Sequence, residues 1–179
     1  MTSMFPTKII TSLLCFWLFT VFSEASAYAN QDLPHFLKLN RKVVSLYKSK
    51  EYASALPFAQ QAVKLMDQNL PANPEGLVQA LNNLGELNRK VGNHAAAEAT
   101  FLRSLKISED FLEENHPLIA ILLNNLALLY EDAGKFSEAQ KLYQHSLTIR
   151  EKTLGPNHPT VANLVHKLAT LNSDGVSSQ

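Results

Sequence analysis

The chain has 179 residues, and its 16 Lys and Arg balance 16 Asp and Glu, giving a formal net charge of zero. This balance gives no sign of nucleic acid or an anionic membrane surface as a partner. About 150 residues follow the N-terminal segment, enough for one domain, and Cys15 is the only cysteine, so no disulfide framework is expected.

Residues 1–29 have the composition of a secretory signal peptide. Lys8 precedes an apolar run over residues 9–22, and small residues around Ala27 and Ala29 follow it. The run is short for a helix that spans a bilayer. We therefore expect a chain exported to the periplasm or secreted, cleaved after Ala27 or Ala29 and left without a membrane span. The alternative is an uncleaved signal that anchors the chain to the membrane.

The rest of the chain repeats with a period of 42 residues. Residues 75–116 align without a gap with residues 117–158, and 14 of the 42 columns are identical; Gly92, for example, falls on Gly134. A fixed period of this size is typical of a solenoid, in which each unit packs only against its neighbours. The sequence therefore predicts one repeat domain over residues 31–172.

The first unit, about 33–74, is the most divergent copy. Its apolar residues match the later units in type, but Lys50 stands where the later units have a turn glycine. No His-Pro pair precedes this unit. Such departures are expected of a terminal repeat, because it has only one neighbour.

Each of the next two units predicts a pair of helices. In the unit 75–116 the helices span about 75–91 and 94–113, and Gly92 lies between them. In the unit 117–158 the first helix starts at Pro117 and ends near Gly134, and the second spans about 136–153. A proline in the first turn and a glycine after the last turn are typical helix boundaries.

A final helix, 159–172, is predicted to cap the array. It has one apolar and one polar side, as a terminal element with a solvent-facing surface requires. The tail 173–179 has no periodicity and is predicted to be disordered. The predicted fold is therefore all-α, a solenoid of three antiparallel helix pairs plus a C-terminal capping helix.

The repeat resembles the tetratricopeptide repeat (TPR), in its longer form similar to that of kinesin light chains. The resemblance rests on small and aromatic residues at set positions, such as Gly85, Ala97 and Phe101, and on the string SLKISEDFLEENHPLIAILLNNLALLY. It implies helix pairs whose first helices line a concave face, and a scaffold that binds proteins or peptides without catalysis. It does not imply a motor protein as the partner.

A polar stripe on the first helix of each unit marks the expected groove. In the second unit it contains Gln79, Asn82, Asn83, Glu86 and Arg89, spaced as neighbours on one helix face. Steps of 42 residues align the stripes of all units. One column reads Asn40, Asn82, Asn124 and His166, and the next contains Asn83 and Asn125.

Side-chain amides offer both a donor and an acceptor, so a column of them could pair with the main chain of an extended peptide. The resemblance supports this hypothesis, because asparagines at related positions bind peptide backbones in other arrays of the family. The candidate groove residues are Asn40, Asn82, Asn83, Glu86, Arg89, Asn124, Asn125, Leu128, Glu131 and His166. Arg89, Lys90, Glu131 and Lys167 would bias the charge of the partner. The alternatives are structural: Asn83 and Asn125 would bond neighbouring helix ends, and His166 would be a solvated residue of the cap.

The sequence offers no catalytic or metal-binding motif. It contains no HExxH, no cysteine and histidine cluster and no glycine-rich phosphate loop, and the histidines of the two Asn-His-Pro loops are expected to be structural. We expect no enzyme and no cofactor. The predicted function is non-catalytic binding of a protein or peptide; the alternative is a structural subunit that self-associates as a homo-oligomer or joins an envelope assembly.

Overall fold

The computed structural model describes residues 33–68 and 72–176. Every regular element in these ranges is a helix, which confirms the predicted all-α fold. The helices are 33–48, α2 (Tyr52–Asp67), α3 (Pro74–Lys90), α4 (His94–Phe111), α5 (Pro117–Asp132), α6 (Phe136–Leu154) and α7 (Pro159–Val176). The predicted signal peptide, 1–29, and residues 177–179 of the predicted tail lie outside the described residues.

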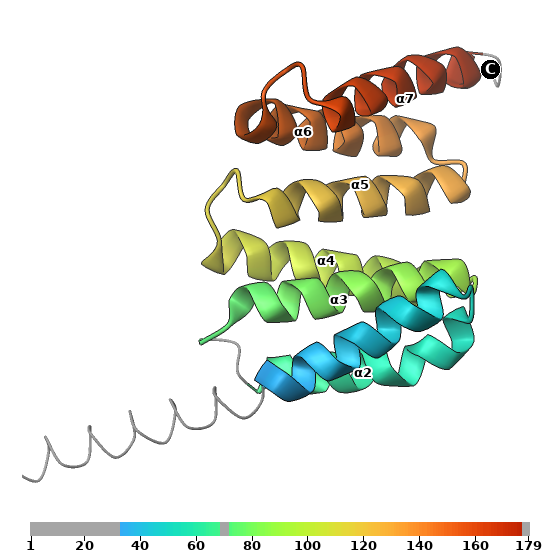
Figure 1. Ribbon diagram of the computed structural model, residues 1–179. Helices are drawn as coiled ribbons and strands as arrows, with labels where there is room; N and C mark the ends of the chain where they lie inside the picture. The colour runs from blue at the N-terminus through green and yellow to red at the C-terminus, as the bar shows by residue number, and fades with distance from the viewer. Residues whose placement is uncertain (1–32, 69–71, 177–179) are drawn as a thin grey trace, which may run out of the picture.

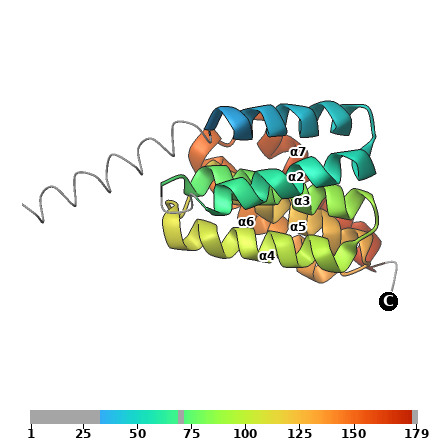
Figure 2. The same ribbon diagram turned by 90° about the horizontal axis from the view of Figure 1, so that it is seen from below.

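The helices stack in chain order as antiparallel pairs (Figure 1). Helix 33–48 pairs with α2, α3 with α4, and α5 with α6, while α7 covers the open side of the last pair. We call the first helix of each unit its A helix and the second its B helix; α7 occupies the A position of a fourth unit. In the view from below, the pairs lie behind one another (Figure 2). Contacts therefore join neighbouring helices and the successive A helices α3 and α5.

Two A helices start at a His-Pro pair, and in each the histidine side chain caps the start of the helix. The Nδ1 atom of His116 accepts a hydrogen bond from the backbone N–H of Leu118 at 3.3 Å, and His158 Nδ1 accepts one from Thr160 at 3.2 Å. Asn73 caps α3 in the same way through Gly76 N–H, at 2.9 Å. These side chains satisfy N–H groups that a helix start leaves without partners.

The capping helix is longer than predicted. α7 runs to Val176, whereas the sequence predicted an end at 172 and a disordered tail from 173. Leu171 is buried in a cluster with Ala127 and Tyr143, so α7 is held against the third unit as far as this residue. No proline interrupts the residues that follow.

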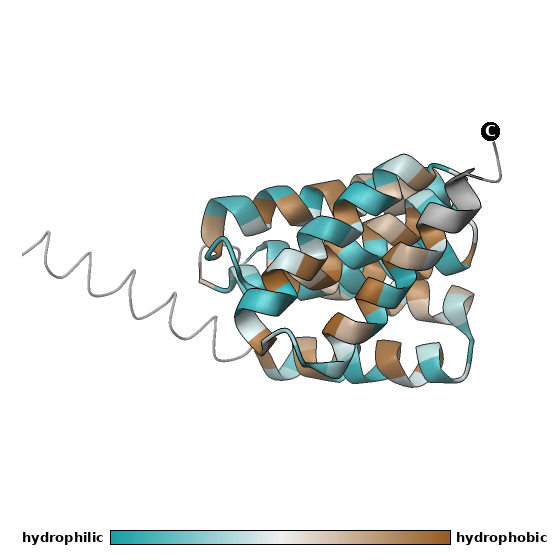
Figure 3. Ribbon diagram, turned by 90° about the horizontal axis from the view of Figure 1, so that it is seen from above, coloured by the Kyte–Doolittle hydropathy of each residue, from teal (hydrophilic) through white to brown (hydrophobic). Residues whose placement is uncertain are grey.

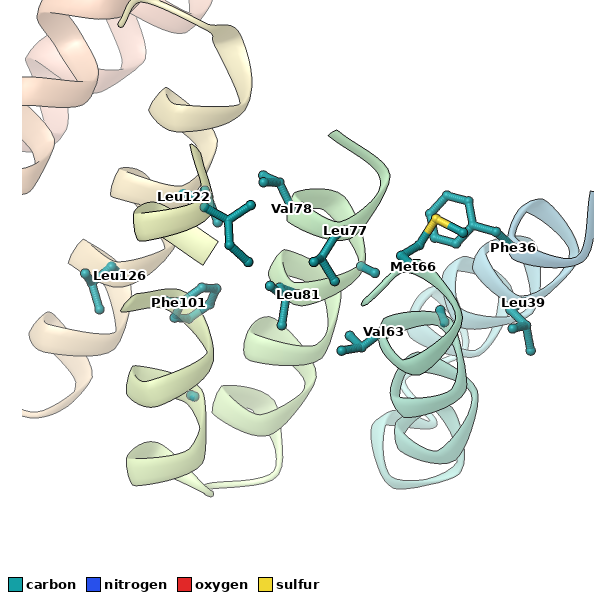
Figure 4. Packing of buried hydrophobic residues seen from close by; sticks show 14 of the residues in the cluster. Phe36, Leu39, Val63, Met66, Leu77, Val78, Leu81, Phe101, Leu122 and Leu126 are labelled. Carbon is teal, nitrogen blue, oxygen red and sulfur yellow. The ribbon is translucent and has the colours of Figure 1, made fainter. Parts of the chain in front are cut away.

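The largest apolar cluster runs from helix 33–48 to α5, and three smaller clusters complete the core. Phe101 of α4 lies between Leu81 of α3 and Leu126 of α5 (Figure 4), and all three side chains are almost fully buried. Hydrophobic and hydrophilic residues alternate along the helices (Figure 3). The core therefore continues from one unit to the next, as a solenoid requires.

The turn between the A and B helices needs a left-handed backbone in every unit. Lys50, Gly92 and Gly134 occupy one repeat column and have φ angles of 61°, 83° and 73°. Glycine adopts this conformation without steric cost, whereas a side chain at this position costs about 1–2 kcal/mol. The first unit therefore carries backbone strain that the other two units avoid.

We expect Lys50→Gly to raise the free energy of unfolding by about 1 kcal/mol, because it relieves this strain. Gly92→Ala is the matched opposite change; nothing lies within 4 Å of the added Cβ, so only the backbone is affected. It should lower stability by a similar amount. Urea unfolding of the three proteins measures both effects, and a destabilised Lys50→Gly variant would contradict the assignment.

Candidate functional site

Two asparagine pairs connect successive A helices on the predicted stripe. Asn83 Nδ2 donates to Asn40 Oδ1 at 2.7 Å, and Asn125 Nδ2 donates to Asn82 Oδ1 at 2.8 Å. The two predicted columns therefore bond to each other from one unit to the next. This is a structural role, although the partners are side chains of the adjacent A helix and not helix ends.

Each paired amide is half-buried and uses only one of its two polar atoms in these bonds. In the part of the chain that the structure describes, Asn82 Nδ2 and Asn83 Oδ1 have no hydrogen-bond partner. An amide can both donate and accept, so the remaining atoms are available to a ligand. The structural and the binding roles of these residues are therefore compatible.

The ladder of amides ends at Asn124. The next partner in the pattern is Lys167, which instead donates from Nζ to Glu131 Oε1 at 2.6 Å. Asn124 makes no side-chain hydrogen bond to any described residue, although it is only half-exposed. Its whole amide remains free. His166, the last residue of this column, is exposed on the cap.

A network of charges ties the first three A helices together. Tyr47 donates to Glu86 at 2.8 Å, and the Arg89 guanidinium bonds Glu86 at 2.8 Å and Asp132 at 2.5 Å. Burial and the bond to Glu86 raise the pKa of Tyr47 to about 12. The bond to Glu86 is also the main cause of a raised pKa at Arg89, so this arginine stays charged.

Glu131 connects helices in the C-terminal half of the array, as Glu86 does in the N-terminal half. It accepts a hydrogen bond from Tyr143 at 3.1 Å, in addition to the ion pair with Lys167. Burial and the nearby Glu131 raise the pKa of Tyr143 well above its ordinary range, so the phenol stays protonated. Glu131 thus joins α5 to both α6 and α7.

The predicted charge bias is neutralised within the chain. Arg89 is paired with two carboxylates, Lys90 lies 3.6 Å from Glu86, and Lys167 is paired with Glu131. These three cations therefore face three anions, Glu86, Asp132 and Glu131. A partner would meet little net charge from these residues.

Two pockets lie along the stripe. The first-unit pocket has a volume of about 340 Å³ and is mainly apolar; its lining is Val43, Val44, Tyr47, Lys48, Asn82, Asn83 and Glu86. The C-terminal pocket has a volume of about 310 Å³ and a more polar lining, which comprises Asn124, Leu128, Tyr143, Arg150, Thr160, Asn163, Leu164 and Lys167. Five candidate groove residues thus line these pockets. A larger hollow of about 540 Å³, between helix 33–48 and α2, contains none of the candidates.

The sequence reasoning missed Arg150. Its repeat column contains Met66 and Ser108 in the earlier units, so a charge appears only in the last unit. This change of chemistry within a regular column was the available signal. The predicted groove residues all belong to first helices of the units, whereas Arg150 lies on α6, the second helix of its unit.

The repeat family can be assigned from sequence. The signature of the family described as "Tetratricopeptide repeat" matches residues 37–110, 76–152 and 119–174, which together cover most of the chain. The chain belongs to the tetratricopeptide repeat family. No curated protein matches the sequence as a relative.

Solved TPR structures show the same architecture. The crystal structure of BtubC (BKLC) from P. vanneervenii covers 86% of this chain with a TM-score of 0.72 and 21% identity. A putative kinesin light chain with nearly identical TPR-like repeats, from Podosopora anserina, covers 76% with a TM-score of 0.69 and 20% identity. This chain spans 62% and 65% of those two chains, less than two thirds of their length. The likeness establishes the fold as a TPR-like array.

Two further observations concern metal sites and membrane spans. Among the described residues, no three His, Cys, Asp or Glu side chains gather as a metal site would require. Within the same ranges, no helix has the length and apolar character needed to cross a membrane.

Proposed function

We propose that this TPR chain is a non-catalytic binding protein that holds an extended segment of a partner protein along its A helices. TPR domains in general mediate protein–protein interactions. The observation that carries the proposal is the position of the two pockets. Both lie on the stripe of residues that the repeat pattern marked as groove-facing, one near each end of the array.

Exposed apolar residues on the same stripe support a peptide ligand. Leu37, Val44 and Ile121 are large hydrophobic residues with exposed fractions of 42%, 42% and 39%. They stand in groove-facing columns of the A helices, and Val44 lines the first-unit pocket. A bound segment would cover this apolar surface, whose burial contributes about 25 cal/mol per Å².

The free halves of the amides provide the polar part of recognition. Asn82 Nδ2 and Asn83 Oδ1 lie at the first-unit pocket, and Asn124 lies at the C-terminal pocket. They can donate to and accept from the main chain of an extended segment, which leaves specificity to the pockets. Because Arg89, Lys90, Glu131 and Lys167 are paired within the chain, shape and apolar contact select the partner at these residues more than net charge does.

Export is the second part of the proposal. The apolar run over residues 9–22, followed by Ala27 and Ala29, supports a cleaved signal and a periplasmic or secreted chain. Intact-mass measurement of the chain recovered from its host tests it. Loss of the segment up to Ala27 or Ala29 is expected, and a mature chain that begins at Met1 would contradict cleavage.

The binding proposal is tested with peptides selected on the full chain from a displayed library of random short sequences. We expect Asn124→Ala to weaken the selected peptides about tenfold and to leave the urea midpoint unchanged, because its amide bonds no other described residue. Asn82→Ala should weaken binding and also lower stability by about 1 kcal/mol, because Asn125 loses its acceptor.

Gln144→Ala, an exposed amide on α6 outside the groove, is the matched control and should change neither property. Two results would contradict the proposal. One is that no selected peptide loses affinity when residues of the A helices are substituted. The other is that the Asn124→Ala variant binds the selected peptides as tightly as the Gln144→Ala control does.

A further inference from the structure

Three repeat columns connect each later A helix to the unit before it. They hold Leu87, Leu129 and Leu171; Leu84, Leu126 and Leu168; and Ala80, Leu122 and Leu164, all of them buried or half-buried. Leu87 packs in one cluster with Val43 and Ala59 of the first unit, and Leu171 packs in another with Tyr143 of the third unit. These columns therefore carry the packing between successive units.

Polar residues occupy the same columns in the first unit, where they form a surface that we call the N-terminal face. Ser45, Lys42 and Lys38 are all exposed, and they line the hollow of about 540 Å³ between helix 33–48 and α2. The rest of the lining is His35, Leu39, Arg41 and Phe58. The Nζ atom of Lys42 lies 5.9 Å from the centre of the Phe58 ring. The N-terminal face is therefore a mainly apolar hollow with cations around it.

The cations of this face have no acidic partner. Helix 33–48 contains no Asp or Glu, and its cations are Lys38, Arg41, Lys42 and Lys48. No carboxylate of the described residues lies within ion-pair distance of them, whereas Arg103 of α4 is paired with Asp67. Lys38 and Lys42 are also neighbours on one side of the helix, where like charges repel each other. An anionic partner would relieve this repulsion.

A surface of opposite character lies at the end of α4 and in the loop that follows, over residues 109–114, which we call the acidic segment. Its carboxylates are all exposed and belong to Glu109, Asp110, Glu113 and Glu114. Only Asp110 has a basic partner among the described residues, Lys106 on the same helix at 3.5 Å. Phe111 lies among the carboxylates with an exposed fraction of 48%.

The repeat pattern does not account for the acidic segment. The third unit has Lys152, Thr153, Gly155 and Pro156 in the columns of Asp110, Phe111, Glu113 and Glu114. The fold of a unit therefore requires neither the aromatic ring nor the carboxylates at these positions.

The acidic segment and the N-terminal face complement each other. The segment offers an exposed aromatic ring flanked by unpaired carboxylates, and the face offers an apolar hollow surrounded by unpaired cations. In one copy the two surfaces lie apart, because helix 33–48 is at one end of the stack and the loop between α4 and α5 is beside its middle (Figure 1). A contact between them therefore requires a second copy.

We propose that the chain self-associates through a contact in which the acidic segment of one copy docks on the N-terminal face of the next. Phe111 enters the hollow beside Phe58, and the carboxylates pair with Lys38 and Lys42. The contact joins two different surfaces, so each copy keeps one of them free for a further copy. A segment this short buries less than the area of about 1,200 Å² expected of a stable interface, so the association is weak and depends on salt.

The same cations disfavour end-to-end stacking, the other way in which a solenoid could self-associate. In that arrangement α7 of one copy would cover helix 33–48 of the next. α7 presents Ala162, Val165 and Ala169, which are exposed and uncharged. Lys38 and Lys42 would be buried against them without a partner, which is unfavourable.

Sedimentation of the chain recovered from its host tests the proposal over a range of concentrations. At low ionic strength the average mass should rise with concentration. In about 1 M sodium chloride, where the Debye length is about 3 Å, it should return to that of the monomer. A mass that does not change with concentration at low ionic strength would overturn the proposal, as would an association that salt does not weaken.

Two charge-reversal variants identify the surfaces. Lys38→Glu/Lys42→Glu alters the N-terminal face, Glu113→Lys/Glu114→Lys alters the acidic segment, and each should weaken self-association by about tenfold or more. An equimolar mixture of the two should associate again, because each variant retains the surface that the other has lost. A mixture that stays monomeric, or a single variant that associates as the native chain does, would contradict the proposed contact.

Lys64→Glu/Lys141→Glu is the matched control, since it reverses two exposed lysines outside both surfaces and should leave self-association unchanged. Thermal melting confirms that each variant is folded, and a variant that does not fold is replaced by glutamine at the same positions. Asn124→Ala should also associate as the native chain does, because neither surface contains a candidate groove residue. Self-association and binding in the groove can therefore fail independently.

A peptide of residues 108–116 with both ends capped separates a second copy from another partner. It should compete with self-association in the native chain and should not bind Lys38→Glu/Lys42→Glu. If the chain stays monomeric at every concentration while its N-terminal face binds this peptide, the face receives an acidic segment of a different protein and self-association is refuted.

Discussion

The contact between Gly85 and Phe101 sets the spacing between the two helices of the central unit. A Cβ atom added at Gly85 would lie 2.6 Å from Cε1 of the Phe101 ring, which is fully buried. The ring therefore packs directly on the backbone of α3. Real Cβ atoms do not approach so closely, so the pair can close only because this position has no side chain.

The other units meet the same constraint with different residues. In the third unit the equivalent positions hold Ala127 and Tyr143, which pack in one cluster, while the first unit has Val43 and Ala59, with the larger residue on the A helix. A small residue on one helix thus faces a larger one on the other. Successive A helices lie near enough for amides and ion pairs to bridge them.

The candidate site depends both on the regular repeat pattern and on the position where that pattern fails. Where the repeat holds, the asparagine pairs and the Glu86–Arg89–Asp132 network connect neighbouring A helices and leave only half of each amide free. Where it fails, at Lys167, Asn124 loses its partner and the C-terminal pocket opens. The first-unit pocket offers mainly apolar contact, so the two ends of the groove have different chemistry.

The sequence predicted the architecture well because the residues that pack the helix pairs and end the helices recur every 42 residues. Helix boundaries follow from prolines and glycines, and α4 starts at His94 as expected. The bonds between columns could not be predicted, because they join residues 43 apart, such as Asn82 and Asn125, and depend on how far one A helix is shifted along the next. Likewise, only the fold shows that Asp132 neutralises Arg89, and that Arg150 of a B helix lines a pocket together with Asn124.

The packing constraint is tested most directly by introducing Gly85→Ala into the native chain and into a Phe101→Ala variant, and measuring the free energy of unfolding in urea. Alanine favours a helix over glycine by about 1 kcal/mol. The account predicts that Gly85→Ala destabilises the native chain by about 1–3 kcal/mol, through overpacking against the ring, and stabilises the variant that lacks the ring. Stabilisation in both backgrounds would contradict it.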